Sequence, residues 1–230
     1  DEATKCPAHL TDMLDAALTS EQLKNAVDKM KNKSCPGPLG LSNRLLKAIF
    51  PLIQVVLVKA GNSLLFSDAP PEIPGWLFHR TVVFIPKPGK SPTSEDSYRG
   101  LSMLENIFKM YSTAIAGRMA RILKLTQDPE QYGFTEGKSC MEPTRTVIDT
   151  ILHANQNNQP LIVLSTDLYK AFDTISLDHI ERSLDFFEFP EKYKNAFMRL
   201  ARNGTLQFEI NGHLSEDFHL NRGTGQGAPK

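Results

Sequence analysis

The first part of the chain shows the hydrophobic spacing of short α-helices. Apolar residues recur every three or four positions across residues 10–30, and the polar run at residues 19–21 supplies a cap between two helices. Residues 34–40 are rich in proline and glycine, which predicts a rigid turn. The sequence therefore begins with a small helical lead-in.

Helical spacing continues over residues 41–67, with predicted interruptions near Pro51 and Gly61. The most apolar stretch of this segment, residues 48–58, also contains Gln54 and is shorter than the roughly 20 apolar residues that span a bilayer. We therefore expect a helix of the protein core and no membrane segment.

The middle of the chain predicts a strand, a loop and two helices. Aromatic and β-branched residues dominate residues 79–86, and a polar, turn-rich loop follows over residues 87–98. Apolar positions at helical spacing predict a long amphipathic helix over residues 101–124 and a second helix over residues 143–154. The polar face of the long helix is expected to carry Lys109, Arg118, Arg121 and Lys124.

The last part predicts a buried strand, two helices and a hairpin. The apolar run at residues 161–164 predicts a strand that is buried on both faces and ends at Asp167. Helical spacing returns over residues 177–187 and 191–201, and alternation with an Asn-Gly turn predicts a hairpin over residues 206–220.

These elements predict an α+β protein with an antiparallel sheet packed against helices. We divide the chain into a helical N-terminal extension over residues 1–34, a central region over residues 35–160 and a C-terminal region over residues 161–230.

Composition is that of an ordinary globular protein, with 230 residues of which 40% are hydrophobic and 23% charged. The net charge is zero, which by itself does not indicate a nucleic-acid-binding surface. Charge is nevertheless segregated: residues 79–124 hold eight Lys or Arg and three acids, whereas residues 125–190 hold four Lys or Arg and eleven acids. This segregation suits a protein that holds a polyanion with one segment and divalent cations with another, although two solvated faces would give the same pattern.

The cysteines and histidines do not indicate a zinc site or a disulfide framework. Cys6, Cys35 and Cys140 form no Cys-x-x-Cys pair, and no His-x(3–5)-His pair is flanked by cysteines. Since no basic-then-apolar leader opens the sequence, we expect an intracellular protein, nuclear or cytoplasmic, rather than a secreted one.

Asp167 is the strongest candidate for a metal ligand. A carboxylate at the carboxyl end of a buried strand faces the crevice where such sheets hold ligands. A simple helix cap is the alternative role. Phosphatases with a strand-end Asp-x-Asp motif need an acid two positions on, but Tyr169 stands there and the next acid is Asp173, so that class is not indicated.

Residues 167–173 read Asp-Leu-Tyr-Lys-Ala-Phe-Asp, and an apolar run precedes them. This segment resembles motif A of reverse transcriptases from non-LTR retrotransposons and group II introns. The resemblance covers roughly residues 34–230 and implies a fingers-like region over residues 35–160 and an incomplete palm over residues 161–230. The supporting motifs follow in family order, at residues 37–40, 84–90, 98–102, 131–134, 203–204 and 225–229, the last two resembling motif B.

The resemblance implies RNA-directed DNA polymerase chemistry. Enzymes of this kind use two Mg²⁺ ions, fixed by carboxylates, to activate a primer 3′-hydroxyl and stabilise the leaving pyrophosphate. Asp167 matches the first of these carboxylates, the backbone carbonyl of Leu168 matches a further ligand, and Asp173 matches a structural position. The implied partners are an RNA template, a DNA primer and dNTPs, with the template–primer hybrid recognised by shape and backbone.

The resemblance also implies a nucleotide site. Lys87 and Arg99 match the basic residues that grip the triphosphate, although either could be a solvated loop residue. Phe172 matches the ring beneath the incoming sugar, which leaves no room for a 2′-hydroxyl; the alternative is a core aromatic. A glycine-rich turn matches the segment that contacts nucleotide and template, namely Gly225, Gln226 and Gly227.

The sequence departs from the family pattern at Leu39, where aspartate is usual, and at Gly100, where proline is usual. The aromatic-Ala-Asp-Asp hairpin of motif C and the thumb do not occur in it. Because one carboxylate cannot hold two catalytic magnesium ions, we expect this chain alone not to polymerise. The alternative hypothesis is a non-catalytic fragment that binds nucleic acid or serves as a scaffold.

Overall fold

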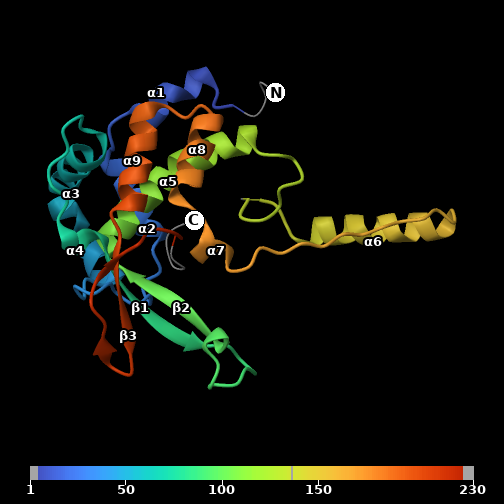
Figure 1. Cartoon of the computed structure of the whole chain (residues 1–230). Coiled ribbons are helices and arrows are strands. Elements are labelled where there is room, and N and C mark those ends of the chain that lie inside the picture. The colour runs from blue at the N-terminus through green and yellow to red at the C-terminus, as the bar shows by residue number, and fades with distance from the viewer. Residues whose placement is uncertain (1–4, 136, 225–230) are drawn as a thin grey trace.

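The structure is a computed structural model that describes residues 5–135 and 137–224 (Figure 1). The chain opens with η2 (Ala8–Leu10), α1 (Thr11–Asp15) and α2 (Ser20–Lys29). Thr19 caps α2 through a reciprocal capping box with Gln22, in which each side chain accepts a hydrogen bond from the other residue's backbone amide. The predicted pair of short helices and the cap between them are confirmed.

Helix α3 (Asn43–Phe66) runs without a break, so the predicted interruptions at Pro51 and Gly61 are wrong. At Gly61, a Cβ atom would lie 2.5 Å from Cε1 of Tyr111, and glycine therefore permits close approach of α3 to the next long helix. Burial of one face of α3 outweighs the hydrogen bond that is lost at Pro51.

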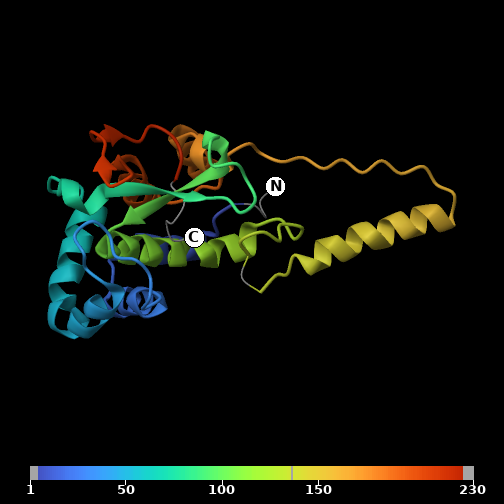
Figure 2. The ribbon, with the colours of Figure 1, turned by 90° about the horizontal axis from the view of Figure 1, so that it is seen from below.

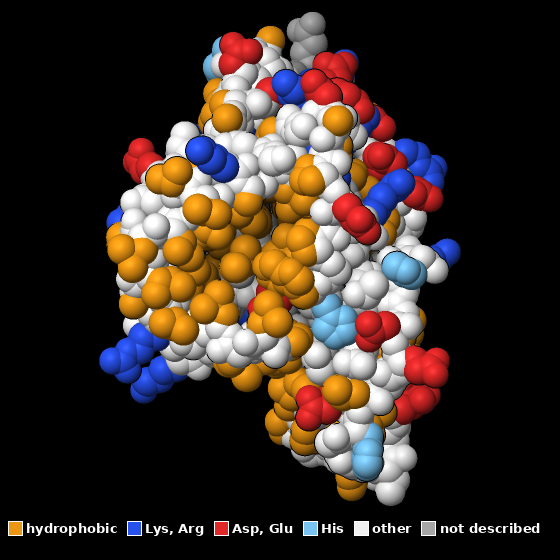
Figure 3. All heavy atoms as spheres, turned by 90° about the vertical axis from the view of Figure 1, so that its left-hand side faces the viewer, with side chains coloured by type: hydrophobic (Ala, Val, Ile, Leu, Met, Phe, Trp, Pro, Cys, Tyr) orange, Lys and Arg blue, Asp and Glu red, His pale blue; other side chains and the backbone are white. Residues whose placement is uncertain are grey.

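The outer face of α3 is apolar. Leu52, Val55 and Val56 are exposed there, on the side of the molecule where Figure 3 shows a broad hydrophobic area. By length and composition, α3 is the one helix in the described part of the chain that could cross a membrane, and core helices pass the same test.

The sheet is mixed rather than antiparallel throughout. After the short α4 (Gly75–Phe78), β1 (His79–Pro86) pairs antiparallel with β2 (Tyr98–Leu104), and η3 (Glu95–Ser97) lies in the loop between them. Strand β3 (Thr205–Ile210) pairs parallel with β1, which corrects the expected antiparallel sheet. The α+β class itself is confirmed.

The predicted C-terminal hairpin is confirmed. Strand β3 pairs antiparallel with β4 (His213–Leu214) and with β5 (Phe218–His219). Asn211 and Gly212 have φ angles of 53° and 78°, as a type I′ turn requires.

Helix α5 (Asn106–Thr126) begins later than the apolar spacing indicated, because residues 101–104 belong to β2. A short apolar run fits either period, and the hydrogen-bonding partner β1 decides for a strand. The expected exposure of Arg118 on this helix is also wrong. Arg118 is 2% exposed and donates hydrogen bonds to the carbonyls of Leu14 and Ala16 at 2.8 and 2.6 Å.

Helices α2, α3 and α5 share one hydrophobic core with α8 (Leu177–Phe186) and α9 (Glu191–Arg202). Tyr193 of α9 is fully buried in this core, and its hydroxyl donates a 2.9 Å hydrogen bond to the carbonyl of Ile115. The helices predicted over residues 177–187 and 191–201 are thus confirmed.

An arm projects from this body (Figures 1 and 2). It consists of α6 (Met141–Gln156) and an extended return segment, residues 157–170. The helix predicted over residues 143–154 is confirmed, but the buried strand predicted over residues 161–166 is wrong. No strand in the described residues pairs with this segment, and Ile162 is 94% exposed.

Candidate functional site

The residues that match motif A lie where the arm returns to the body. Lys170 has a left-handed conformation, with φ 46°, and caps the short helix α7 (Ala171–Thr174). Its carbonyl accepts hydrogen bonds from the amides of Asp173 and Thr174 at 2.8 and 3.1 Å. Asp167 and Leu168 lie just before this turn, with exposed side chains. The turn therefore anchors the end of an otherwise open segment.

The start of the glycine-rich turn is docked onto α7. The amide of Thr224 donates a 2.9 Å hydrogen bond to the carbonyl of Phe172, and the amide of Gly223 donates a 2.8 Å bond to that of Ile175. Gly223 has φ 84°, and a Cβ atom there would lie 2.9 Å from the Phe172 carbonyl oxygen. Only glycine fits this approach without a shift. Gly225, Gln226 and Gly227 follow directly but lie outside the described residues.

The loop between β1 and β2 contacts the same turn. Nζ of Lys170 lies 3.3 Å from a carboxylate oxygen of Asp96, and Nζ of Lys87 donates a 2.6 Å hydrogen bond to the Asp96 carbonyl. A hydrogen bond with Tyr169, followed by one with Asp96, raises the pKa of Lys170 above its ordinary value. Lys87 and Lys170, which belong to different motifs of the sequence, thus both contact Asp96.

Arg99 lies further along β2, in register with Ile85 of β1, and its side chain is exposed. It belongs to the same hairpin as Lys87, and both basic residues flank the β1–β2 loop. No hydrogen bond or ion pair between described residues joins Arg99 to Asp173. Its predicted role therefore stays a prediction.

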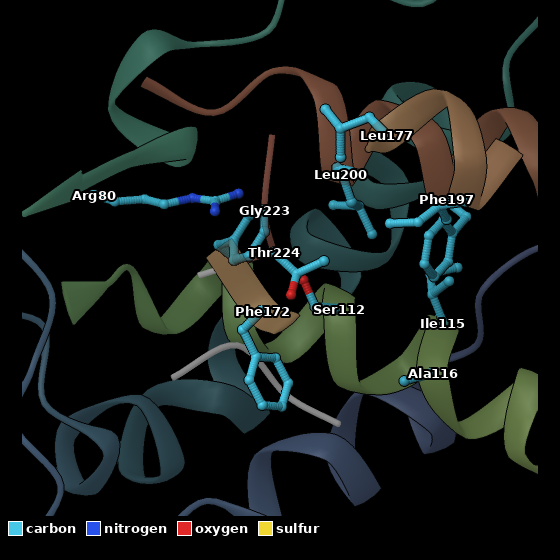
Figure 4. A pocket seen from close by; sticks show the side chains of 13 residues that line it. Arg80, Ser112, Ile115, Ala116, Phe172, Leu177, Phe197, Leu200, Gly223 and Thr224 are labelled. Atoms are coloured by element: carbon cyan, nitrogen blue, oxygen red, sulfur yellow. The ribbon is translucent and has the colours of Figure 1, made fainter. Parts of the chain in front are cut away.

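Phe172 stands at the edge of a cavity of about 230 Å³ between α5, α8, α9 and the glycine-rich turn (Figure 4). Its ring makes an edge-on contact with Phe134, with 6.2 Å between centroids. The walls are mostly apolar, including Leu177 and Leu200. Phe172 is half-buried, so it is neither a fully enclosed core aromatic nor a free surface ring.

Two polar residues of this cavity were not found from the sequence. Arg80 is 4% exposed, and its Nε and Nη1 atoms have no hydrogen-bond partner among the described residues; the same holds for the hydroxyl of Ser112. The Arg80 guanidinium lies 5.7 Å from the ring centroid of Phe108 and reaches toward Gly223 (Figure 4). Burial lowers its pKa from the ordinary value. The alternation of β1, in which Arg80 shares a face with buried Val82, was the available signal.

Acidic residues do not gather into a metal centre in the part of the chain that the structure describes. No group of three or more His, Cys, Asp or Glu side chains there could hold a metal ion. Asp167 contributes one carboxylate and Leu168 one carbonyl, which is fewer oxygen ligands than Mg²⁺ requires. The described residues alone therefore do not fit a two-magnesium site.

Sequence comparison assigns the chain to a class. The family described as reverse transcriptase (RNA-dependent DNA polymerase) matches residues 85–230, and the chain belongs to this family. Its relatives narrow the assignment to the reverse transcriptase domains of non-LTR retrotransposons, the LINE type.

Two relatives illustrate this likeness. The chain is 29% identical over 162 residues to the RNA-directed DNA polymerase from mobile element jockey of Drosophila melanogaster. The aligned region covers 70% of this chain and 17% of that protein. It is 23% identical over 222 residues to the Pol polyprotein from the type-2 retrotransposable element R2DM of the same species, covering 96% of this chain and 20% of the relative. The chain thus spans about a fifth of the length of these relatives.

Proposed function

We propose that the protein containing this chain extends a DNA primer on an RNA template. The observation that carries the proposal is that the glycine-rich turn and the β1–β2 loop, which are distant in sequence, both contact residues 170–173 of the motif A segment. The carbonyl of Phe172 accepts a hydrogen bond from Thr224 of the glycine-rich turn, and Lys170 forms an ion pair with Asp96 of the β1–β2 loop. Such convergence is what a nucleotide site assembled from distant segments requires.

Within this site, each predicted residue has a proposed role. Lys87 and Arg99 bind the triphosphate, the arginine through two oxygens and the lysine as a point charge. Phe172 lies beneath the sugar of the incoming dNTP and excludes a 2′-hydroxyl. Gln226, flanked by Gly225 and Gly227, contacts the nucleotide and the template, and Asp173 keeps a structural role beside Gly223.

Asp167 and the carbonyl of Leu168 are the proposed metal ligands of this chain. Together with further carboxylates, these two ligands would hold Mg²⁺, which would supply activation of the primer hydroxyl and stabilisation of the leaving pyrophosphate. The described residues hold only part of such a site. The fingers-like and palm-like division at residue 160 is likewise part of the proposal.

Primer extension by the full-length protein, with an RNA template and either dNTPs or NTPs, tests this function. The wild type should extend with dNTPs, and Phe172→Val should raise ribonucleotide incorporation relative to dNTPs by about 10- to 100-fold, as expected when one pocket wall is cut back. Phe186→Val, an exposed aromatic of α8, is the matched control and should not change the ratio. No extension by the wild type on RNA would exclude the proposal.

The incomplete metal ligand set favours a second candidate for the chain by itself, a nucleic-acid-binding or scaffold module. Primer extension by the 230-residue chain, measured together with its binding to the same template–primer hybrid, tests this candidate. A protein that binds the template–primer hybrid but never extends it is a binding module.

A further inference from the structure

Helices α2 and α5 lie side by side in opposite directions. Gln22, near the start of α2, accepts a 2.8 Å hydrogen bond from Arg118 in the second half of α5. Lys29, at the end of α2, lines the same hollow as Lys109, which lies in the first turn of α5. A channel runs alongside the two helices, and its part near Lys109 is also bounded by β2 and by the segment that follows α2.

The channel consists of two adjoining hollows of about 320 and 310 Å³, which share Ala26, Lys29 and Thr113 in their walls. We call this surface the α2–α5 groove. Its accessible basic lining residues are Lys29, Lys31, Lys109, Arg121 and Lys124, and the buried, hydrogen-bonded Arg118 also lines it. Neither hollow has an Asp or Glu among its lining residues in the described part of the chain.

This concentration of positive charge is local, since the whole chain carries 26 basic and 26 acidic residues. Asp28, the nearest acid on α2, pairs instead with Lys24 at 2.6 Å. Lys109 is half-buried in the groove, and desolvation lowers its pKa even though Cys35 and Glu105 act in the opposite direction. An anionic ligand would offset the free-energy cost of that desolvation by Coulomb attraction.

The groove lies on a different face of α5 from the candidate nucleotide site. Phe108, Ser112 and Ala116 of α5 face the cavity beneath Phe172. Lys109, Thr113 and Arg121 face the groove instead. A ligand of the groove therefore does not occupy the nucleotide site.

The dimensions favour a polymer over a small phosphate. Lys109 and Lys124 are fifteen positions apart on α5, or about 22 Å at the rise of an α-helix. A stacked strand rises about 3.4 Å per nucleotide, so a strand of this length contains roughly six phosphates. Hollows of this size, set between packed helices, admit a single strand more readily than a duplex.

We propose that the α2–α5 groove binds the sugar–phosphate backbone of a single nucleic-acid strand, apart from the nucleotide site. The choice of a nucleic acid as the ligand rests on the proposed function, whereas the location of the groove does not depend on the proposed catalytic residues. Recognition by lysine and arginine of phosphates is independent of sequence and strongly salt-dependent.

Binding of a labelled 20-nucleotide single-stranded RNA to the 230-residue chain tests the groove, measured by fluorescence anisotropy between 50 and 200 mM salt. The triple variant Lys29→Gln/Lys31→Gln/Lys109→Gln removes three groove cations. The slope of log K against log salt concentration should become shallower by about 2, since each lost phosphate contact contributes about 0.7 for a single strand. The affinity near 0.1 M salt should fall by about 100-fold. DNA of the same sequence distinguishes RNA-selective from general strand binding.

A matched control has the same loss of net charge. Lys5→Gln/Lys59→Gln/Lys192→Gln removes three exposed lysines that do not line the groove, and should bind RNA as the wild type does. Equal weakening by both triples would overturn the proposal, as would wild-type binding by the groove triple. Stronger competition by poly-glutamate than by RNA would also overturn it, in favour of an acidic peptide.

The outcome is separable from that of the proposed function. If the full-length protein fails to extend primers while the groove triple still loses RNA binding, the groove stands and the polymerase proposal fails. If extension occurs and the groove triple binds RNA normally, only the groove proposal fails.

Discussion

The body of the protein and its arm contain similar residue types but differ in how they are held. Leu23 and Tyr193 of the body are fully buried, whereas Ile162 and Leu164 of the arm are 94% and 84% exposed. The arm has a helix and an apolar run, yet Ala154 is the single buried residue of α6. Packing partners, rather than hydrophobicity alone, therefore decide which segments are stabilised, and the candidate metal ligand lies in the less supported region.

Truncation of one leucine in each region should give the largest contrast. Leu23→Ala should lower the free energy of unfolding by about 2–5 kcal/mol, because it leaves a cavity in the core. Leu164→Ala should change it by less than about 0.5 kcal/mol, as at exposed sites. Urea unfolding followed by circular dichroism measures both. A large loss for Leu164→Ala would mean that the arm packs against the body.

Substitution of Arg118, the buried arginine of α5, should have the second-largest effect on the free energy of unfolding. Arg118→Leu leaves the carbonyls of Leu14 and Ala16 without their donor, and should destabilise the fold by about 3 kcal/mol. Arg121→Leu removes an exposed neighbour on the same helix and should stay within about 0.5 kcal/mol of the wild type. Comparable losses for the two variants in thermal unfolding would argue against the buried role.

A pair of glycines tests the contact between α7 and the glycine-rich turn. Gly223→Ala forces a Cβ toward the Phe172 carbonyl at positive φ, and should cost about 1–3 kcal/mol. Gly117→Ala, in α5 with no heavy atom within 4 Å of the added Cβ, should instead stabilise by up to about 1 kcal/mol. The same sign of change in both variants would contradict the docking of the turn.

The smallest effect concerns pH. Burial raises the pKa of Tyr111 to about 12, and its hydroxyl donates a 2.8 Å hydrogen bond to the carbonyl of Leu57. The unfolded tyrosine ionises near pH 10, so this stabilisation is complete below about pH 10 and is lost as the pH rises through 12. Burial raises the pKa of Tyr193 as well, which adds to the same loss.

Tyr111→Phe should lose about 0.5–1.5 kcal/mol at neutral pH, the value of one hydrogen bond. Its stability should then fall less steeply than that of the wild type between pH 10 and 12. Tyr98→Phe, whose hydroxyl bonds to Pro92 in an exposed loop, is the control and should keep the wild-type slope. Identical slopes for all three proteins would show that Tyr111 is not titrated with unfolding.

Local patterns predicted the local elements. The cap at Thr19, the hairpin turn at Asn211 and the helices near the C-terminus follow from residue spacing within short windows. Two errors arose where pairing partners decide the outcome: residues 101–104 became strand β2 because β1 lies beside them, and residues 161–166 stayed unpaired. A sequence window does not contain those partners.

The candidate site was predictable to the extent that motifs name residues. The sequence indicated Lys87, Phe172 and Asp173, and the structure ties all three to one turn and its neighbours. Arg80 and Ser112 were missed because neither belongs to a motif, and their burial depends on packing between distant elements. Conversely, Asp167 was chosen for the end of a strand that the described residues do not form.

The most direct test of the account is Asp167→Asn in the full-length protein, measured by primer extension on RNA and by the free energy of unfolding. The proposed role of this carboxylate is to hold a catalytic metal ion, and such ions stabilise transition states by several kcal/mol. Extension should therefore fall by at least about 100-fold, while the free energy of unfolding is unchanged. Asp149→Asn, an exposed acid of the same arm in a weak surface ion pair, should leave both as in the wild type. Undiminished extension by Asp167→Asn would contradict the assignment of the catalytic carboxylate.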